Sequence, residues 1–307
     1  MNSNTLLGLL AGLAAALIGA GWQLASRYGV TTTLGPMELA ALRYLVPALV
    51  LMPLLWRTGL LPPGVARRDL LLLVLGGGLP FGLLVLAGAQ FAPAAHISVF
   101  MSGSMPVFTA LLCLVVLGEK LPGWRWAGLT LVAAGVVALA STGSAMAALG
   151  HWRGDLLFLL AAVLWAVHTL AFRRCGLTPW HAAALVNAWS ALLLLPVLAI
   201  TGAPQLLTAP WQDVALQALW QGGIAGLLGL VTYLAAVARL GASRAALSAA
   251  AVPPLTALGG ALVLGEALDG RVIAVVMLVA VGLVLASGAV CRPRQGNRGR
   301  ASPGGRS

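Results

Sequence analysis

Charged side chains are scarce in this sequence of 307 residues, where Asp, Glu, Lys and Arg together make up 8%. Soluble globular proteins carry about 25% charged residues. A soluble chain of this length could not cover its surface with so few charges, and 60% of its residues are hydrophobic. The shortage of charge therefore excludes an ordinary soluble protein and predicts an all-α polytopic membrane protein, in which each spanning helix needs about 20 apolar residues.

Cysteines, acidic residues and cofactor motifs are also rare or missing. Three scattered cysteines exclude a disulfide-stabilised secreted domain. No Walker loop, HExxH or CxxC motif occurs, so we expect no cofactor, no bound metal and no drive by ATP. None of the seven acidic residues falls near the centre of an apolar run, which argues against a carboxylate proton relay and leaves His168, or no coupling ion at all.

What the sequence does contain is a succession of long apolar runs separated by Gly, Pro and charged residues. Ten transmembrane helices are predicted. They cover residues 5–25, 37–56, 69–90, 95–117, 124–141, 155–173, 180–201, 215–238, 243–264 and 271–290. The connecting loops are short, so no sizeable soluble domain is expected. The first run lacks basic residues before it and is long for a signal peptide, so we interpret it as retained.

The basic residues indicate how the helices are oriented. Of the 18 Lys and Arg residues, only Arg27, Arg153 and Arg271 fall on one side of the predicted topology, and Arg43 lies inside a span. The other fourteen collect on the opposite side, which places both termini in the cytoplasm. The basic residues behind the net charge of +11 lie in the short loops on this side and in the C-terminal tail, and they form no continuous basic face. Binding to nucleic acid is therefore not expected.

Two long segments of the chain match each other at a constant offset of 147 residues. Pro106 corresponds to Pro253, the Gly-Glu pair at 118–119 to the pair at 265–266, and Gly135 to Gly282. The match continues upstream more weakly, and Trp22 resembles Trp165. The sequence therefore predicts two five-helix repeats, residues 1–145 and 146–291, followed by a disordered basic cytoplasmic tail at 292–307.

The odd number of helices in each repeat has a consequence for topology. Two five-helix repeats in one chain must enter the membrane with opposite orientation. This inverted arrangement is common in secondary transporters, where the substrate binds near the midplane between the halves. The predicted topology thus favours a transporter that works by alternating access.

The sequence at this point resembles the EamA-type permeases of the drug/metabolite transporter superfamily. The resemblance covers nearly the whole chain. It is carried by the doubled Pro and Gly-Glu pattern, Trp22 and Trp165, Arg43 early in the second span, and the RLGAS turn at 239–243. It implies ten helices, a central cavity and export of small metabolites or amino acids, although the family also includes importers and exchangers.

Pro106 and Pro253 are each predicted to lie about halfway along a span. A proline inside a helix removes one hydrogen bond and frees the carbonyl four residues earlier, here at Ser102 and Ala249. Lipid cannot satisfy these carbonyls, so they should face protein or a wet cavity. We interpret both prolines as helix kinks that shape the cavity. An ordinary packing kink is the alternative.

Three charged residues are candidates for helix ends or gates: Glu119, Glu266 and Arg43. Each glutamate ends a span and is expected to cap the next helix, with Arg125 and Arg271 as partners. A gate contact is the alternative. Arg43 is expected to extend to the surface, or to pair with Glu38 or Glu266, with binding of a substrate carboxylate as a further alternative.

The remaining polar and aromatic residues within the spans are candidates for the substrate cavity. They are Trp22, Gln23, Gln90, His96, Ser98, Ser102, Trp165, His168, Thr169 and Tyr233. Together they offer the groups that a small amphipathic solute needs. Taken singly, each is also typical of a hydrogen bond between helices or of an interfacial anchor.

The sequence therefore predicts a multi-pass permease of the inner membrane, and not an enzyme. Its expected partners are a small-molecule substrate and the lipid bilayer, and a homodimer is left open. A membrane sensor or scaffold without transport is one alternative. An intramembrane enzyme is another, but it would require two acidic groups, or an acid and a histidine, at one depth inside the membrane.

Overall fold

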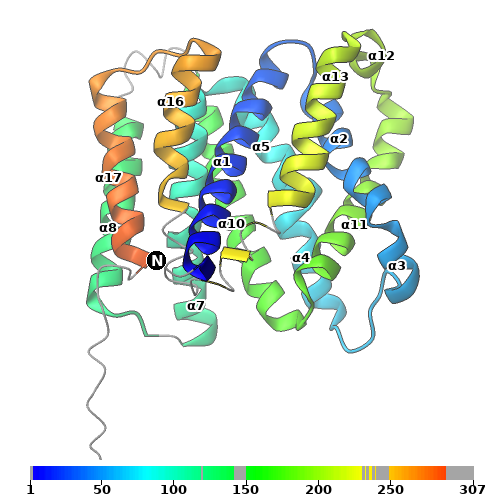
Figure 1. Ribbon diagram of the computed structural model, residues 1–307, viewed down its shortest axis with the longest axis horizontal. Coiled ribbons are helices and arrows are strands. Elements are labelled where there is room, and N and C mark those ends of the chain that lie inside the picture. Colours follow the sequence, from blue (N-terminus) through cyan, green and yellow to red (C-terminus); the bar gives the residue numbers. More distant parts are fainter. Residues whose placement is uncertain are drawn as a thin grey trace, which may run out of the picture.

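The computed structural model describes residues 3–118, 120–141, 150–229, 232, 235–236, 239 and 249–287. Within these ranges every regular element is a helix (Figure 1). The helices are α1 (Ser3–Thr31), α2 (Pro36–Val50), α3 (Met52–Thr58), α4 (Arg67–Gly77), α5 (Leu79–Phe91), α6 (Ala94–His96), the π-helix η1 (Ile97–Gly103), α7 (Met105–Leu117), α8 (Gly123–Ser141), α10 (His151–Cys175), α11 (Pro179–Thr201), α12 (Pro204–Thr208), α13 (Trp211–Gln217), the π-helix η2 (Ala218–Leu228), α16 (Val252–Leu264) and α17 (Gly270–Ser287). The prediction of an all-helical chain is confirmed for this part of the molecule.

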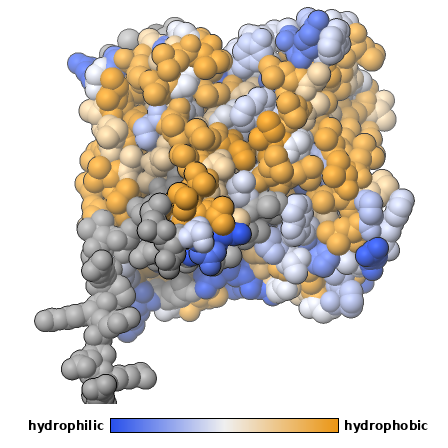
Figure 2. All heavy atoms as spheres, in the orientation of Figure 1, coloured by the Kyte–Doolittle hydropathy of each residue, from blue (hydrophilic) through white to orange (hydrophobic). Residues whose placement is uncertain are grey.

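The outer surface of the molecule is more hydrophobic than a soluble fold allows. On α1, Leu10 and Leu17 are about half exposed, whereas the small residues Ala16 and Ala20 are buried. Figure 2 shows hydrophobic residues over the middle of one face, with hydrophilic residues gathered toward its upper and lower edges. Leucines outside and small residues inside suit a lipid environment, where close helix contact stabilises the fold.

Seven helices of the described part are long and apolar enough to cross a membrane, or eight if α2 and α3 count as one span. These two helices meet at Leu51 with a bend of 60°. The helix α16 is apolar but has only 13 residues. The predicted spans 215–238 and 243–264 both run into residues outside the described ranges, so the described helices match eight of the ten predicted spans and parts of the other two.

Pro106 lies about halfway along the apolar span Ala94–Leu117, as predicted, and the residues before 249 in the span of Pro253 are outside the described ranges. The chain breaks at Ser104 and at Ala251, so that each proline lies in the first turn of a new helix, α7 or α16. In the first turn a proline forfeits no hydrogen bond of its own helix, because that N–H has no partner there. The prolines therefore begin helices, and the irregular segment before Pro106 is the π-helix η1.

The helices α7 and α16 occupy corresponding positions, 147 residues apart in the sequence. The bounds of α7 and α16 differ by that number at both ends. Each helix ends at a glycine with left-handed backbone, Gly118 (φ 66°) and Gly265 (φ 67°), a conformation that favours glycine. Two stretches of similar sequence thus adopt the same local structure, including the turn that precedes each Gly-Glu pair.

The helices α8 and α17 pack tightly and run in opposite directions. A Cβ on Gly128 would lie 2.6 Å from the carbonyl oxygen of Gly282, and a Cβ on Gly282 would lie 2.8 Å from that of Gly128. Farther along α8, Gly135 meets Val279 and Val275, which precede Gly282 on α17. The order of contacts makes the two helices antiparallel, and only glycine permits so close a crossing.

Helices from the two ends of the chain are interleaved. The first helix, α1, packs on α16, and α10 packs on α7 as well as on α4 and α5. In the centre of Figure 1, α1 crosses in front of α10. The core of the molecule therefore lies where α1, α5, α10 and η1 meet, and its largest hydrophobic cluster includes Trp22, Phe81, Phe100 and Phe158.

Candidate functional site

A row of aromatic side chains crosses the centre of the molecule. Trp22 on α1 stacks on Phe81 of α5 with ring centroids 6.2 Å apart. The ring centroid of Trp165 on α10 lies 5.1 Å from that of Phe81. The ring of His168 follows 5.1 Å beyond Trp165, and its Nδ1 lies 2.9 Å from the carbonyl oxygen of Leu73. The two tryptophans that the sequence comparison paired are thus brought together through Phe81.

The residues Trp22 and Gln23 on α1 bind side chains of the two π-helices. Trp22 Nε1 donates to Gln221 Oε1 on η2 at 2.8 Å, and Gln23 Nε2 donates to Ser102 Oγ on η1 at 2.7 Å. The turns of a π-helix are wider than those of an α-helix, and such turns are frequent at functional sites. The polar residues of α1 are therefore bonded on two sides by irregular segments that lie far apart in the sequence.

Two glutamines of this cluster were missed by the sequence analysis. Gln221 donates to Ser26 Oγ at 3.0 Å and to Gln217 Oε1 at 3.3 Å, and Gln217 donates to the carbonyl oxygen of Ala25 at 2.8 Å. Both glutamines are buried. Their spacing of four residues, which puts them on one helix face inside an otherwise apolar run, is the signal that could have identified them.

Arg43 lies midway along α2, beside the aromatic row. Its guanidinium carbon is 4.3 Å from the centroid of the Trp22 ring and 5.7 Å from that of Tyr44. Its Nε and Nη1 are buried and have no hydrogen-bond partner among the described residues. An unpaired arginine costs about 2.5–3.5 kcal/mol at the centre of a spanning helix.

The partners expected for Arg43 are not the ones it has. Neither Glu38 nor Glu266 forms an ion pair with it. Glu266 pairs with Arg27, and no ion pair of Glu38 occurs in the described part of the chain. Arg43 is partly exposed as a residue, but its Nε and Nη1 are buried. Packing on Trp22 holds the guanidinium inside the protein by a cation–π contact.

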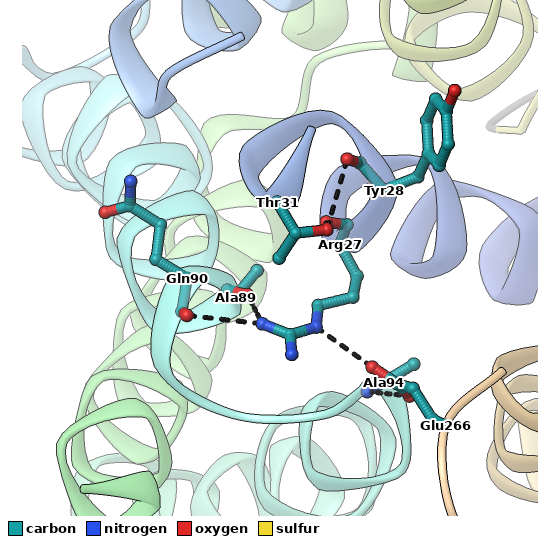
Figure 3. Close-up of polar contacts among 7 residues, drawn as sticks. All are labelled: Arg27, Tyr28, Thr31, Ala89, Gln90, Ala94 and Glu266. Carbon is teal, nitrogen blue, oxygen red and sulfur yellow. Dashed lines mark hydrogen bonds and ion pairs between the residues drawn. The ribbon is translucent and has the colours of Figure 1, made fainter. Parts of the chain in front are cut away.

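A second polar cluster lies at the end of the molecule where α1 ends, which we call the Arg27 end. Arg27 Nε donates to Glu266 Oε1 at 2.9 Å, and Nη1 donates to the carbonyl oxygens of Ala89 at 2.5 Å and Gln90 at 3.2 Å (Figure 3). The second oxygen of Glu266 accepts from the backbone N–H of Ala94 at 2.8 Å. One arginine and one glutamate thereby connect α1, the α5–α6 junction and the residues after α16.

The expected role of Glu266 was capping of the next helix with Arg271 as partner, and both details are wrong. Asp269 caps that helix, α17, by accepting from the N–H of Val272 at 2.8 Å. The left-handed turn at Gly265 instead directs Glu266 toward α6, whose first free N–H it binds. Glu119, the corresponding residue of the first repeat, lies outside the described residues.

A small cavity opens beside the Arg27–Glu266 ion pair. Its volume is about 230 Å³. It is lined by Arg27, Tyr28, Thr31, Thr32, Val263, Leu264 and Glu266. The threonine hydroxyls donate to carbonyl oxygens of α1 itself, and Figure 3 shows the Tyr28 ring pointing away from the guanidinium. The side chains of Arg27, Glu266 and both threonines are thus already bonded within the protein.

His96 and Asp155 form a second side-chain contact at the Arg27 end, which is an ion pair when the imidazole is protonated. His96 Nδ1 lies 2.7 Å from Asp155 Oδ1, with the two side chains 3% and 13% exposed. The His96 ring stacks on Phe100 and meets the edge of the His151 ring at a centroid distance of 5.5 Å. His96 was predicted for the substrate cavity, and Asp155 was taken as a residue of a helix end. Their pairing joins α6 to α10.

The other predicted cavity residues are not gathered at the centre. Ser98 Oγ donates to the carbonyl oxygen of Ala95, and Thr169 Oγ1 donates to that of Trp165, so both bond within their own helices. Gln90 is exposed, and Figure 3 shows its side chain pointing away from Arg27. Tyr233 lies outside the described residues. No group of three metal-ligating side chains occurs among the residues that the structure describes.

These observations define the class of protein: a multi-pass helical membrane protein with a buried polar and aromatic centre. The model of the EamA-like transporter family matches the chain twice, at residues 6–141 and 152–288. The chain therefore belongs to the EamA-like transporter family and is a permease of the transporter type. The resemblance inferred from Trp22, Arg43 and the doubled Pro and Gly-Glu pattern is confirmed.

Two relatives and one solved structure are similar to the chain. Protein PagO of Salmonella typhimurium is 26% identical over 237 residues, which cover 75% of each protein. The uncharacterized protein PA1977 of Pseudomonas aeruginosa is 34% identical over 196 residues, 62% of this chain and 63% of that protein. A crystal structure of another protein, 21% identical, superimposes with a TM-score of 0.59 over 97% of this chain and 99% of the other, and this likeness concerns the fold alone.

Proposed function

We propose that this permease is a secondary transporter that exports a small metabolite or amino acid across the inner membrane by alternating access. The observation that carries the proposal is the construction of the centre. Trp22 of the first half and Trp165 of the second lie on the same aromatic row, at Phe81. A site shared in this way by two halves changes when the halves move relative to one another.

The proposal includes two inverted repeats. It is supported by the antiparallel contact of α8 and α17, which occupy corresponding positions in the sequence repeat. Helices related by a two-fold axis in the membrane plane run in opposite directions, as this pair does. Further support comes from the equal length of α7 and α16, whose bounds differ by 147 residues at both ends, and from the double match of the family model.

The gate in this proposal is the pair of ionic contacts at the Arg27 end. Arg27 and His96 belong to the first half, and Glu266 and Asp155 belong to the second. Both contacts must separate before the halves can move apart at this end. With the termini in the cytoplasm, the Arg27 end faces the outside, so the closed contacts correspond to a state that is shut toward the outside.

Measured release of metabolites tests whether the protein transports. Cells that overproduce it and cells that lack it are loaded with labelled nutrients, and the compounds in the medium are compared by mass spectrometry. We expect a small set of metabolites to leave the overproducing cells faster. Identical release from both strains would refute export and favour the sensor or scaffold interpretation.

Reporter fusions test the orientation. Fusions after Arg68, Lys120, Arg174 and Arg244 should report the cytoplasm, and fusions near Gln90 and Asp213 should report the opposite side. The positive-inside distribution is the reason for this expectation. A signal from outside after Arg174 would contradict the inverted arrangement, because that loop follows the first helix of the second half.

A further inference from the structure

We propose that Arg43 binds the anionic group, a carboxylate in particular, of the solute that this permease moves. The inference rests on the proposed transport function and specifies the chemical class of its substrate. It begins from a cation inside the protein that no acidic side chain of the described residues neutralises. The two ion pairs of the described chain are Arg27–Glu266 and His96–Asp155, and neither includes Arg43.

The surroundings of Arg43 supply an aromatic surface for its charge and the neighbouring Tyr44 hydroxyl, but no acceptor for Nε or Nη1 among the described residues. Trp22 presents the face of its ring at 4.3 Å, while its Nε1 donates to Gln221. Tyr44 donates its hydroxyl to the carbonyl oxygen of Gly78 at 2.6 Å. Nε and Nη1 of Arg43 are therefore left as buried donors without partners among the described residues. A buried charged donor without an acceptor is unfavourable until one arrives.

A carboxylate is the ligand that would accept hydrogen bonds from Nε and Nη1 of Arg43 and neutralise its charge. A guanidinium binds carboxylates through two parallel N–H···O bonds, with a geometry that an ammonium group does not provide. The Trp22 ring contacts the face of the guanidinium and does not occupy its N–H groups. In the same turn of α1, Gln23 Oε1 is a buried acceptor that also lacks a partner. The centre thus offers unused donors together with one unused acceptor.

The sequence repeat distinguishes Arg43 from residues that only build the fold. Pro36 at the start of α2 corresponds to Pro179 at the start of α11, and this alignment places Val186 opposite Arg43. Val186 is buried in an apolar cluster. A framework role would be needed in both halves, as it is for Trp22 and Trp165. Arg43 breaks the symmetry of the repeat, and recognition of one end of an asymmetric solute requires such a break.

The first experiment identifies the charge of the transported compounds. Proteoliposomes of the purified protein are loaded with an equimolar mixture of the common amino acids, simple mono- and dicarboxylates, sugars, nucleosides and polyamines. The contents are followed by mass spectrometry. We expect loss of compounds that carry a carboxylate. Loss of only uncharged or cationic compounds would overturn the role of Arg43 and leave transport intact, whereas no loss at all would overturn the proposed function itself.

The second experiment tests Arg43 with the best transported compound from that mixture. Arg43→Gln should raise its KM about 10- to 100-fold, the effect of losing a charge-assisted hydrogen bond. Arg43→Lys should recover part of this loss because it keeps the charge. Arg57→Gln, the same change at an exposed arginine after α2, serves as the matched control and should leave KM unchanged.

A purely structural role makes a different set of predictions. If Arg43 only packs against Trp22, Arg43→Gln should lower the yield of folded protein and the thermal midpoint, with KM unaffected. That outcome overturns the proposal. The amide of the transported acid provides the converse check: wild-type protein should bind it much more weakly than the acid, and Arg43→Gln should bind both equally. Equal binding of acid and amide by the wild-type protein would also refute the role of Arg43.

Discussion

The two arginines that face the interior of this protein have opposite surroundings. Arg27 makes an ion pair with Glu266 and donates to the carbonyl oxygens of Ala89 and Gln90. Arg43 has a tryptophan ring beneath it and two buried nitrogens without acceptors among the described residues. The Arg27 guanidinium is neutralised by a carboxylate, whereas no acidic side chain of the described residues neutralises that of Arg43.

The difference separates two uses of the same side chain. A compensated cation contributes to the fold, and Arg27 joins three segments at one end of the molecule. An uncompensated cation works against the fold, so its presence calls for another explanation. The comparison therefore predicts that removal of Arg27 destabilises the protein, whereas removal of Arg43 stabilises it and harms transport.

The largest effect is expected from Arg27→Met, which leaves the Glu266 carboxylate largely buried with only the N–H of Ala94 as donor. Breaking a buried ion pair by removing one partner costs about 3–5 kcal/mol. Unfolding in detergent, followed by circular dichroism, measures the loss. The double variant Arg27→Met, Glu266→Met should recover most of it. A loss below about 1 kcal/mol for the single variant would show that the ion pair does not hold the Arg27 end together.

Arg43→Met should change stability in the opposite direction. The variant removes a charge that costs about 2.5–3.5 kcal/mol at the membrane centre and forfeits a smaller cation–π contact, so we expect a gain of about 2 kcal/mol. The same unfolding measurement applies. If Arg43→Met and Arg27→Met destabilised the protein equally, the contrast between the two arginines would be lost.

A smaller effect is expected at the second ionic contact of the Arg27 end. Asp155→Leu leaves His96 Nδ1 buried without a partner, which should lower stability by about 1.5 kcal/mol. Asp155→Asn keeps an acceptor and should lose less. Asp213→Leu, on α13, is the control, since the Asp213 side chain makes no hydrogen bond among the described residues and only its backbone N–H donates, to Pro210. Equal effects at 155 and 213 would mean that the His96–Asp155 pair adds nothing to the Arg27–Glu266 contact.

The smallest effects are expected from Pro106→Ala and Pro253→Ala. Both prolines lie in the first turn of a helix, where proline suits the backbone and an alanine costs about 0.4–1 kcal/mol through the unfolded state. The two variants should behave alike, because the repeat places them equivalently. Markedly different melting temperatures would indicate that the halves are asymmetric at the prolines as well as at the arginines.

Much of the fold could be predicted because it depends on local composition. The apolar runs indicated a helical membrane chain, and residues 147 apart do form helices of the same length, each ended by a left-handed glycine. The break in the regular helix just before each proline could not be predicted in this way. Where a span breaks depends on the π-turns before it, and at Ser104 the break follows η1, whose Ser102 is bonded to Gln23 of a distant helix.

The candidate site could likewise be predicted only in part from the sequence. Trp22, Trp165 and Arg43 could be identified from the sequence, because aromatic and charged residues inside apolar runs stand out. Their partners could not be identified. The contacts of Glu266 with Arg27, of Asp155 with His96, and of Trp22 with Gln221 join residues that are 239, 59 and 199 positions apart.

The sequence by itself determined that the chain enters a membrane, that two of its segments resemble each other, and that Val186 occupies the position that corresponds to Arg43. Hydropathy and spacing carry this information, because both are properties of neighbouring residues. Only the tertiary structure decided which charges are neutralised. Hydrogen bonds and ion pairs form only between groups that lie within a few ångströms of each other, so Arg27 and Arg43 differ through the helices that fold against them. No pattern along the chain distinguishes the arginine with an acidic partner from the arginine without one.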